Sequence, residues 1–161
     1  MAIVTKTGMD SLDLHHEVPR NSVEHLTLRT AVAEPPYDSI ASKAIVDRAL
    51  NWVGRSKYDN GGWRSSPEYF DCSKLVAFAV TGDYERHGIS TGTITTRSCF
   101  VLVASPKPGD IANRDRGLPD DHCGIYFRDG LMIHAPDDTD NVTIGYVDSS
   151  YVFYRYTGGL V

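Results

Sequence analysis

The chain has 161 residues, which is the size of one ordinary domain. Hydrophobic residues make up 41% of it and charged residues 23%, a composition that excludes wholesale disorder. The net charge is −5 and the Lys and Arg residues form no stripe, so the chain is not expected to bind nucleic acid. No stretch approaches the roughly 18 apolar residues that a membrane-spanning helix needs.

The N-terminal residues differ in character from the rest of the chain. They are polar and weakly periodic, and they end in Glu34-Pro35-Pro36, which resists both helix and sheet. No secretory signal peptide is visible, because the apolar core of such a segment is missing. We expect residues 1–37 to be a partly ordered or strap-like extension, or a segment that docks on a delivery partner or covers a cleft. Residues 38–161 are expected to form one domain.

The first predicted helix covers residues 39–53. Asp38 and Ser39 both offer an N-cap oxygen, and Gly54 is the natural end of the helix. The segment that follows, residues 58–70, is too rich in turn residues to be a regular element.

A second, strongly apolar helix is predicted over residues 72–80. Asp71 is its natural N-cap and Gly82 its natural end. Its inward stripe consists of Leu75, Val76 and Ala79, with Phe78 at the edge.

Beyond residue 108 the hydrophobic period changes to two, which is typical of strands. Turn residues separate the expected strands, at 110–113, 122–127, 131–135, 142–147 and 151–156. Helices followed by a run of antiparallel strands predict an α+β fold with a sheet of about five strands.

Residues 122–135 predict a hairpin whose register can be argued. A three-residue loop, 128–130, with Gly130 left-handed, pairs Ile125 with Ile133 and places apolar side chains on one face. A slip of one residue would turn every side chain to the other face, so this clean segregation favours the three-residue loop over a two-residue turn. His122 and His134 then share the opposite face.

That opposite face also carries Gly124, next to both histidines. A glycine there predicts open space that a bound chain could use. Cys123 points into the apolar face, so we interpret it as a packing residue.

Cys72 is the strongest candidate for a nucleophile. The chain has three cysteines and no CxxC motif, so neither a disulfide framework nor a zinc cage is expected. Cys72 opens the second helix, where free backbone N–H groups stabilise a thiolate and can hold an oxyanion. Such a cysteine needs a base within hydrogen-bond reach and a third group that orients the base, and the two histidines could supply both.

Five short motifs occur in an order and spacing that resemble the NlpC-type cell-wall cysteine peptidases. The resemblance extends from about residue 40 to about residue 156, and the motifs read Tyr58-Asp-Asn-Gly-Gly, Phe70-Asp-Cys-Ser, Pro108-Gly-Asp110, His122-Cys-Gly-Ile-Tyr126 and Met132-Ile-His-Ala135. The resemblance implies a papain-like core with a Cys-His-His triad and no cofactor or metal.

Family positions carry over to named residues of this chain. Cys72 matches the nucleophile, His122 the base and His134 the orienting residue, whose loss should cost less activity than the loss of either partner. Tyr58 matches the tyrosine beside the nucleophile, which is expected to help hold the oxyanion. Two further residues match positions that line the substrate cleft, Asp71 and Ser73.

The chain departs from the family pattern at three places. Lys74 replaces a glycine, and its cation either touches an anionic substrate or points to solvent. Cys123 replaces a valine. Asp59-Asn60 replaces an apolar pair, which alters one wall of the expected cleft.

The family mostly cuts peptidoglycan stem peptides, commonly between γ-D-glutamate and the diamino acid, so this is the expected reaction. The alternatives are an amidase or acyltransferase on the same fold, a wall-peptide binding module without turnover, and a structural α+β domain. A fourth is a metal hydrolase that uses the two histidines with Asp120 or Asp121, although an HExxH-type spacing is absent.

The expected setting is the bacterial cell wall. A leaderless hydrolase of this size suits an injected effector, a phage lysis or tail enzyme, or a trimmed chain. An effector implies an immunity protein that plugs the cleft, and a delivery protein. We expect a monomer.

Overall fold

The computed structural model describes residues 37–60, 69–139 and 141–159. All the described residues belong to one compact unit. The N-terminal extension lies almost wholly outside the described residues, so the predicted boundary at residue 37 stays a prediction. None of the helices in the described ranges has the length and apolar character that crossing a membrane requires.

Helix α2 covers Ile40–Leu50 and starts where the sequence predicted. The Ser39 side chain accepts a hydrogen bond from the Ser42 backbone N–H, and the Ser42 hydroxyl in turn interacts with the Ser39 backbone N–H, which makes a capping box. The predicted end at residue 53 is wrong. Val53 instead bridges Val142, and the N–H of Gly54 donates to the Val142 carbonyl, so pairing with a distant segment replaces the last helical turn.

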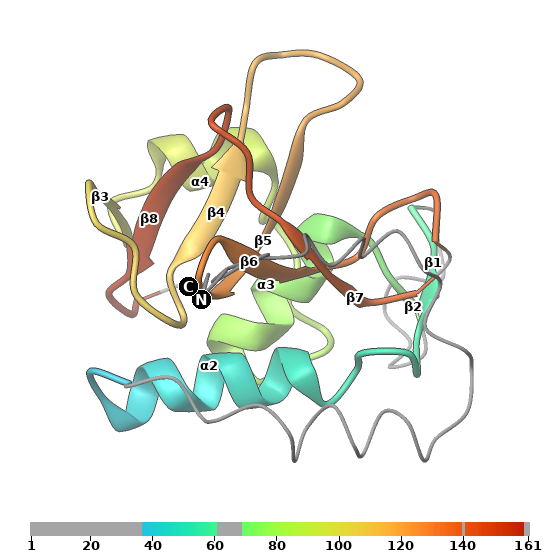
Figure 1. Ribbon diagram of the computed structural model, residues 1–161, viewed down its shortest axis with the longest axis horizontal. Helices are drawn as coiled ribbons and strands as arrows, with labels where there is room; N and C mark the ends of the chain where they lie inside the picture. The colour runs from blue at the N-terminus through green and yellow to red at the C-terminus, as the bar shows by residue number, and fades with distance from the viewer. Residues whose placement is uncertain (1–36, 61–68, 140, 160–161) are drawn as a thin grey trace, which may run out of the picture. The chain divides into compact units, whose positions relative to one another are not determined.

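Helix α3 covers Cys72–Thr81, which confirms the predicted start and the predicted stop at Gly82 and extends the helix by one residue beyond the predicted end at 80. The Asp71 side chain accepts a hydrogen bond from the Lys74 N–H at 2.7 Å, and Gly82 ends the helix with a φ of 78°. The predicted apolar stripe is too narrow, because every residue from Lys74 to Val80 is buried. This helix contacts α2 on one side and the central sheet on the other, as Figure 1 shows.

The central sheet has six antiparallel strands in the order β3-β8-β4-β5-β6-β7. The α+β class is thereby confirmed, with one strand more than expected. The strands are β3 (Phe100–Val103), β4 (Ile111–Arg114), β5 (His122–Arg128), β6 (Leu131–His134), β7 (Thr143–Tyr146) and β8 (Val152–Tyr156).

Four short elements of the described residues escaped the sequence analysis. Strand β3 lies at the sheet edge and leaves Val101 and Leu102 exposed, so it lacks the alternation of a half-buried strand. Helix α4, Thr91–Thr96, consists of weak helix formers and depends on a capping box between Ser90 and Thr93. The segment predicted to be irregular also contains a two-stranded parallel pair, β1 (Lys57–Tyr58) and β2 (Tyr69–Phe70).

The motif Pro108-Gly-Asp110 joins α2 to the sheet. A Cβ atom on Gly109 would lie 2.8 Å from the Ser42 carbonyl oxygen, so only glycine fits against the helix there. The buried Asp110 carboxylate accepts hydrogen bonds from Arg155 at 2.8 Å, which fixes the start of β4 to β8.

The β5–β6 hairpin has the predicted register but not the predicted loop. Asp129 and Gly130 have φ of 48° and 75°, so they form a two-residue turn, and Arg128 pairs with Leu131. A β-bulge between Tyr126 and Arg128 then adds one residue and restores the pairing of Ile125 with Ile133. The two histidines share one face because of this bulge, not because of a three-residue loop.

Candidate active site

A cleft of about 970 Å³ opens at the N-terminus of α3. One wall is the first turn of α3 with the segment that leads to α4, and the other contains the first residue of β5 and the last of β6. All the site residues predicted from the sequence line this cleft: Tyr58, Asp71, Cys72, Ser73, His122 and His134.

The Cys72 thiol lies half-buried at the first position of α3. A hydrogen bond from Cys123 and the hydrogen bond and charge of His122 lower the pKa of Cys72 to about 5, against the opposing effects of burial and of Asp71. The thiolate is therefore the main form of Cys72 at neutral pH, and thiolates are the nucleophilic form of cysteine.

Cys123 is fully buried, as predicted, but it does more than fill the core. Its hydrogen bond with Cys72 and its burial raise the pKa of the Cys123 thiol well above the ordinary value. Because Cys123 keeps its proton, it can donate to the Cys72 sulfur. Cys123 lies on the apolar face of β5, and its hydrogen bond with Cys72 shows that α3 packs on that face. Cys72 also contacts His122, because His122 is the first residue of the strand.

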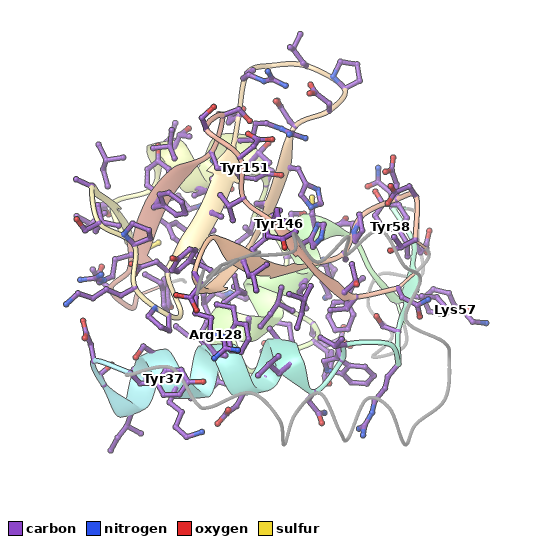
Figure 2. All side chains as sticks on the ribbon, in the orientation of Figure 1. Tyr37, Lys57, Tyr58, Arg128, Tyr146 and Tyr151 are labelled. Carbon is purple, nitrogen blue, oxygen red and sulfur yellow. The ribbon has the colours of Figure 1, made fainter. Side chains whose placement is uncertain are left out.

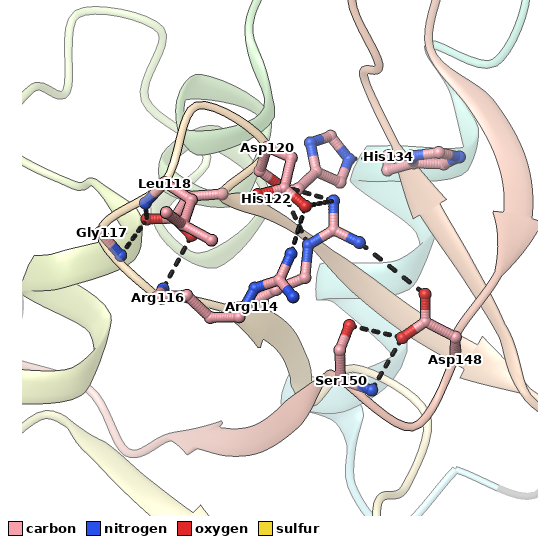
Figure 3. Close-up of polar contacts among 10 residues, drawn as sticks. Arg114, Arg116, Gly117, Leu118, Asp120, His122, His134, Asp148 and Ser150 are labelled. Atoms are coloured by element: carbon pink, nitrogen blue, oxygen red, sulfur yellow. Dashed lines mark hydrogen bonds and ion pairs between the residues drawn. The ribbon is translucent and has the colours of Figure 1, made fainter.

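The two imidazoles lie on adjacent strands in direct contact (Figure 3). His122 Nε2 is 2.8 Å from His134 Nδ1, and the ring planes meet at 81°. Burial and the charge of His122 lower the pKa of His134 to about 3, so His134 is neutral at neutral pH. A neutral His134 ring can accept a proton donor at Nδ1 while Nε2 carries its own proton. Because Nε2 of His122 contacts His134, the other ring nitrogen of His122, Nδ1, is available to the Cys72 sulfur.

Two glycines shape the space around His134. A Cβ on Gly124 would lie 2.8 Å from the Ile133 carbonyl oxygen and 3.0 Å from the His134 Cβ. The predicted open space beside Gly124 is therefore wrong, because the neighbouring strand fills it. Gly145 on β7, which the sequence analysis missed, is tighter still: its Cβ would lie 2.3 Å from His134 Nε2.

Substitution of Gly145 by alanine is expected to push the His134 ring off the His122 ring. Gly145 has no positive φ, so the effect comes from the added methyl group and not from backbone strain. We expect the rate of the predicted stem-peptide cleavage to fall about tenfold, because His122, the predicted base, loses its orientation. Gly92→Ala is the matched control, since a Cβ there meets nothing closer than 3.9 Å. Equal activity of the two variants would contradict this role for Gly145.

Asp71 and Ser73 form a local hydrogen-bonded unit. The Ser73 hydroxyl donates to the Asp71 carboxylate at 2.7 Å, and the same oxygen caps the helix. Asp71 is buried and positions the first turn of α3 around Cys72. Tyr58, on β1, lies on the cleft wall near the end of that strand (Figure 2).

Lys74 does not point to solvent. It is 4% exposed and lines the cleft, and its Nζ donates to the Arg86 carbonyl at 3.4 Å. Of the two predicted alternatives, the solvated one is wrong. The contact with an anionic substrate stays a prediction.

The two carboxylates that the predicted metal hydrolase would use, Asp120 and Asp121, bind groups of the loop between β4 and β5 (Figure 3). Asp121 accepts hydrogen bonds from the backbone N–H groups of three residues, Arg116, Gly117 and Leu118. These bonds, with that of Arg116 the strongest, lower the pKa of Asp121. Asp120 forms an ion pair with Arg116. Among the described residues, no three His, Cys, Asp or Glu side chains are grouped as metal ligands.

Arg114 and Tyr151 are among the cleft residues that the sequence analysis missed. Arg114 on β4 pairs across the sheet with His122, and Tyr151 lies immediately before β8. Neither belongs to a motif that resembles the family. The signal that could have found Arg114 is the β4–β5 register, which follows once the partner of His122 is known.

Comparison with known proteins gives a consistent result. The model of the NlpC/P60 family matches residues 54–161. A probable endopeptidase of Mycobacterium bovis is 33% identical over 115 residues, which are 69% of this chain and 28% of that protein. The probable endopeptidase p60 of Listeria innocua is 30% identical over 99 residues, 59% of this chain and 20% of that protein. The chain thus spans less than a third of the length of either relative.

Solved structures share the fold. The NlpC/p60 domain of the peptidoglycan hydrolase SagA is 28% identical with a TM-score of 0.53, covering 71% of this chain and 97% of that one. The peptidoglycan hydrolase RipB of Mycobacterium tuberculosis is 23% identical with a TM-score of 0.57, covering 71% of this chain and 64% of that one. The predicted NlpC-type fold is therefore confirmed, and the chain belongs to the NlpC/P60 family.

Proposed function

We propose that the protein is a cysteine endopeptidase that cleaves peptidoglycan stem peptides, at the bond between γ-D-glutamate and the diamino acid. The observation that carries this proposal is the arrangement of three side chains in one cleft. The Cys72 thiol hydrogen-bonds His122, and the far nitrogen of that imidazole lies 2.8 Å from His134. The names of the relatives, endopeptidase and peptidoglycan hydrolase, support the substrate class.

The reaction starts with the proton on the imidazole. His122 takes or already holds the Cys72 proton, and the thiolate attacks the carbonyl carbon of the scissile amide. Protonated His122 then donates from Nε2 to the neutral Nδ1 of His134 and from Nδ1 toward the reacting centre. His134 thereby fixes the orientation of the base without becoming charged itself.

The tetrahedral oxyanion needs hydrogen-bond donors. The backbone N–H of Cys72 lies in the first turn of α3, where N–H groups have no partner within the helix, and it would serve together with Tyr58. His122 returns its proton to the leaving amine, and the acyl group stays on the sulfur. Water then attacks the thioester, and the free thiol is restored.

The biological setting follows from the substrate. The protein would act on the cell wall as an injected effector, a phage enzyme or a secreted hydrolase, and as a monomer. An effector would meet an immunity protein in the cleft and a delivery protein on its route. We assign no nucleic-acid partner, in line with the net charge of −5.

The test is a digest of purified peptidoglycan followed by mass spectrometry of the released fragments. Fragments that end in γ-D-glutamate, with a new amino group on the diamino acid, are expected. Release of intact stem peptides from the sugar would assign amidase action instead, and an acyl group transferred to an added amine would assign acyltransferase action. Absence of any fragment would refute the hydrolase.

A further inference from the structure

Tyr151 is a nearly buried side chain whose polar end the mechanism does not use. Only 9% of it is exposed, and it lines the same cleft as Cys72. Its ring packs with Ala112 and Met132 on the sheet face that carries His122. Figure 2 shows the side chain beside the sheet, well apart from Tyr58.

Arg114 fixes the position of this ring. The guanidinium lies 5.0 Å from the ring centroid and is itself held by the Asp120 carbonyl, to which Nε donates at 2.9 Å. A second contact joins Nη1 of Arg114 to Asp148 at 3.7 Å, as Figure 3 shows. A nearly buried ring that packs on apolar side chains and against a guanidinium has little freedom, so the direction of the Tyr151 hydroxyl is largely set before any ligand binds.

The hydroxyl of Tyr151 is a donor without an acceptor. It makes no hydrogen bond within residues 37–60, 69–139 and 141–159. It is also not among the polar atoms that are both fully buried and without a hydrogen-bond partner. Its oxygen is therefore not sealed from solvent, and the residue that carries it lines the cleft. Burial, with a smaller contribution from Asp148 and from the sulfurs of Cys123 and Cys72, outweighs Arg114 and raises the pKa of Tyr151 to about 12. The hydroxyl keeps its proton at neutral pH.

We infer that Tyr151 is a substrate-binding residue, whose hydroxyl donates a hydrogen bond to a carbonyl or carboxylate oxygen of the peptide in the cleft. This inference rests on the proposed function for the identity of the peptide. A protonated phenol next to a guanidinium selects an oxygen acceptor and disfavours an ammonium group of the substrate. Tyr151 thus complements the triad from the β8 side of the cleft.

The test substitutes Tyr151 by phenylalanine, which removes the hydroxyl and keeps the ring that packs on Arg114. We expect kcat/KM on a synthetic stem peptide to fall about fivefold to tenfold, mainly through KM, because one neutral hydrogen bond is lost. The rate at which iodoacetamide alkylates Cys72 should stay unchanged, since the hydroxyl acts on the substrate and not on the nucleophile. Tyr146→Phe is the matched control, because Tyr146 is the exposed last residue of β7.

Two further arms make the outcome decisive. Peptides with a free or an amidated α-carboxylate on the γ-linked glutamate distinguish the acceptors: loss of the Tyr151 effect on amidation identifies the carboxylate, and its persistence identifies a carbonyl. If the wild type cleaves no peptide, the proposed function fails, and calorimetry of peptide binding to Tyr151→Phe and wild type tests the hydroxyl alone. Equal kcat/KM or equal affinity for variant and wild type, at equal thermal stability, would overturn the inference.

Discussion

Substitution of Cys72 by alanine is expected to lower the rate of stem-peptide release by about 10⁴-fold or more, which is below detection in a peptidoglycan digest. The methyl group cannot attack a carbonyl, and the remaining groups can only bind and polarise the substrate. The fold should survive, because Asp71 still caps α3 and Cys72 is only half-buried. Fragment release is measured by liquid chromatography, and the folded state by the thermal unfolding midpoint.

The matched control is Cys99→Ala, a second free cysteine that lies away from the cleft. This variant should keep wild-type activity within a factor of about two, although loss of a buried sulfur costs some stability. Alkylation by iodoacetamide should abolish wild-type activity and leave a single labelled cysteine in a peptide map. Fragment release by the Cys72→Ala protein would refute nucleophilic catalysis by this thiol.

Local sequence signals were sufficient to predict where the candidate nucleophile, Cys72, lies in the fold. Asp71, the apolar run after it and Gly82 predict α3 with both boundaries, because caps and periodicity act within a few residues. The position of Cys72 at the helix N-terminus follows from these alone. The register of the histidine hairpin was also predictable, since only one pairing places all apolar residues on one face.

Features that depend on distant partners were not predictable. The bulge in β5 changed the turn but not the register, and hydrophobic pattern alone does not distinguish these two solutions. Gly124 suggested space for a ligand, whereas the neighbouring strand occupies it. The same limit hid Gly145, which lies on the next strand of the sequence and makes room for His134 only through the pairing of β7 with β6.

The contact between two cysteines illustrates the limit at the site itself. Cys123 looked like a packing residue, and its burial agrees with that interpretation. Only the packing of α3 on β5 brings its thiol to Cys72, where its hydrogen bond is the strongest influence that lowers the pKa of Cys72. The lowered pKa of Cys72, on which the proposed mechanism relies, therefore depends on two neighbours in β5, Cys123 and His122, and not on His122 alone.

Substitution of His122 by alanine is expected to reduce kcat/KM by about 10³-fold, within the range of general acid–base catalysis. The variant loses the group that protonates the leaving amine and the positive charge beside the thiolate. It also leaves the Nδ1 atom of His134 without its partner. His87→Ala is the control, because His87 lines the cleft but is exposed and no described contact joins it to Cys72.

The pH dependence of Cys72 alkylation separates the loss of the proton donor from the loss of the positive charge beside the thiolate. In the wild type, the pKa of Cys72 is lowered to about 5, so the iodoacetamide rate should be constant above pH 6 and fall as the pH drops through 5. Removal of His122 takes away a hydrogen bond and a charge that both lower this pKa, so the falling limb must move to higher pH. If the pKa of Cys72 rises from about 5 to about 6, the alkylation rate at pH 5 falls about fivefold, because the thiolate fraction drops from about one half to about one tenth. A limb that stays in place, or moves to lower pH, would show that His122 does not stabilise the thiolate and would leave Cys123 as its main support.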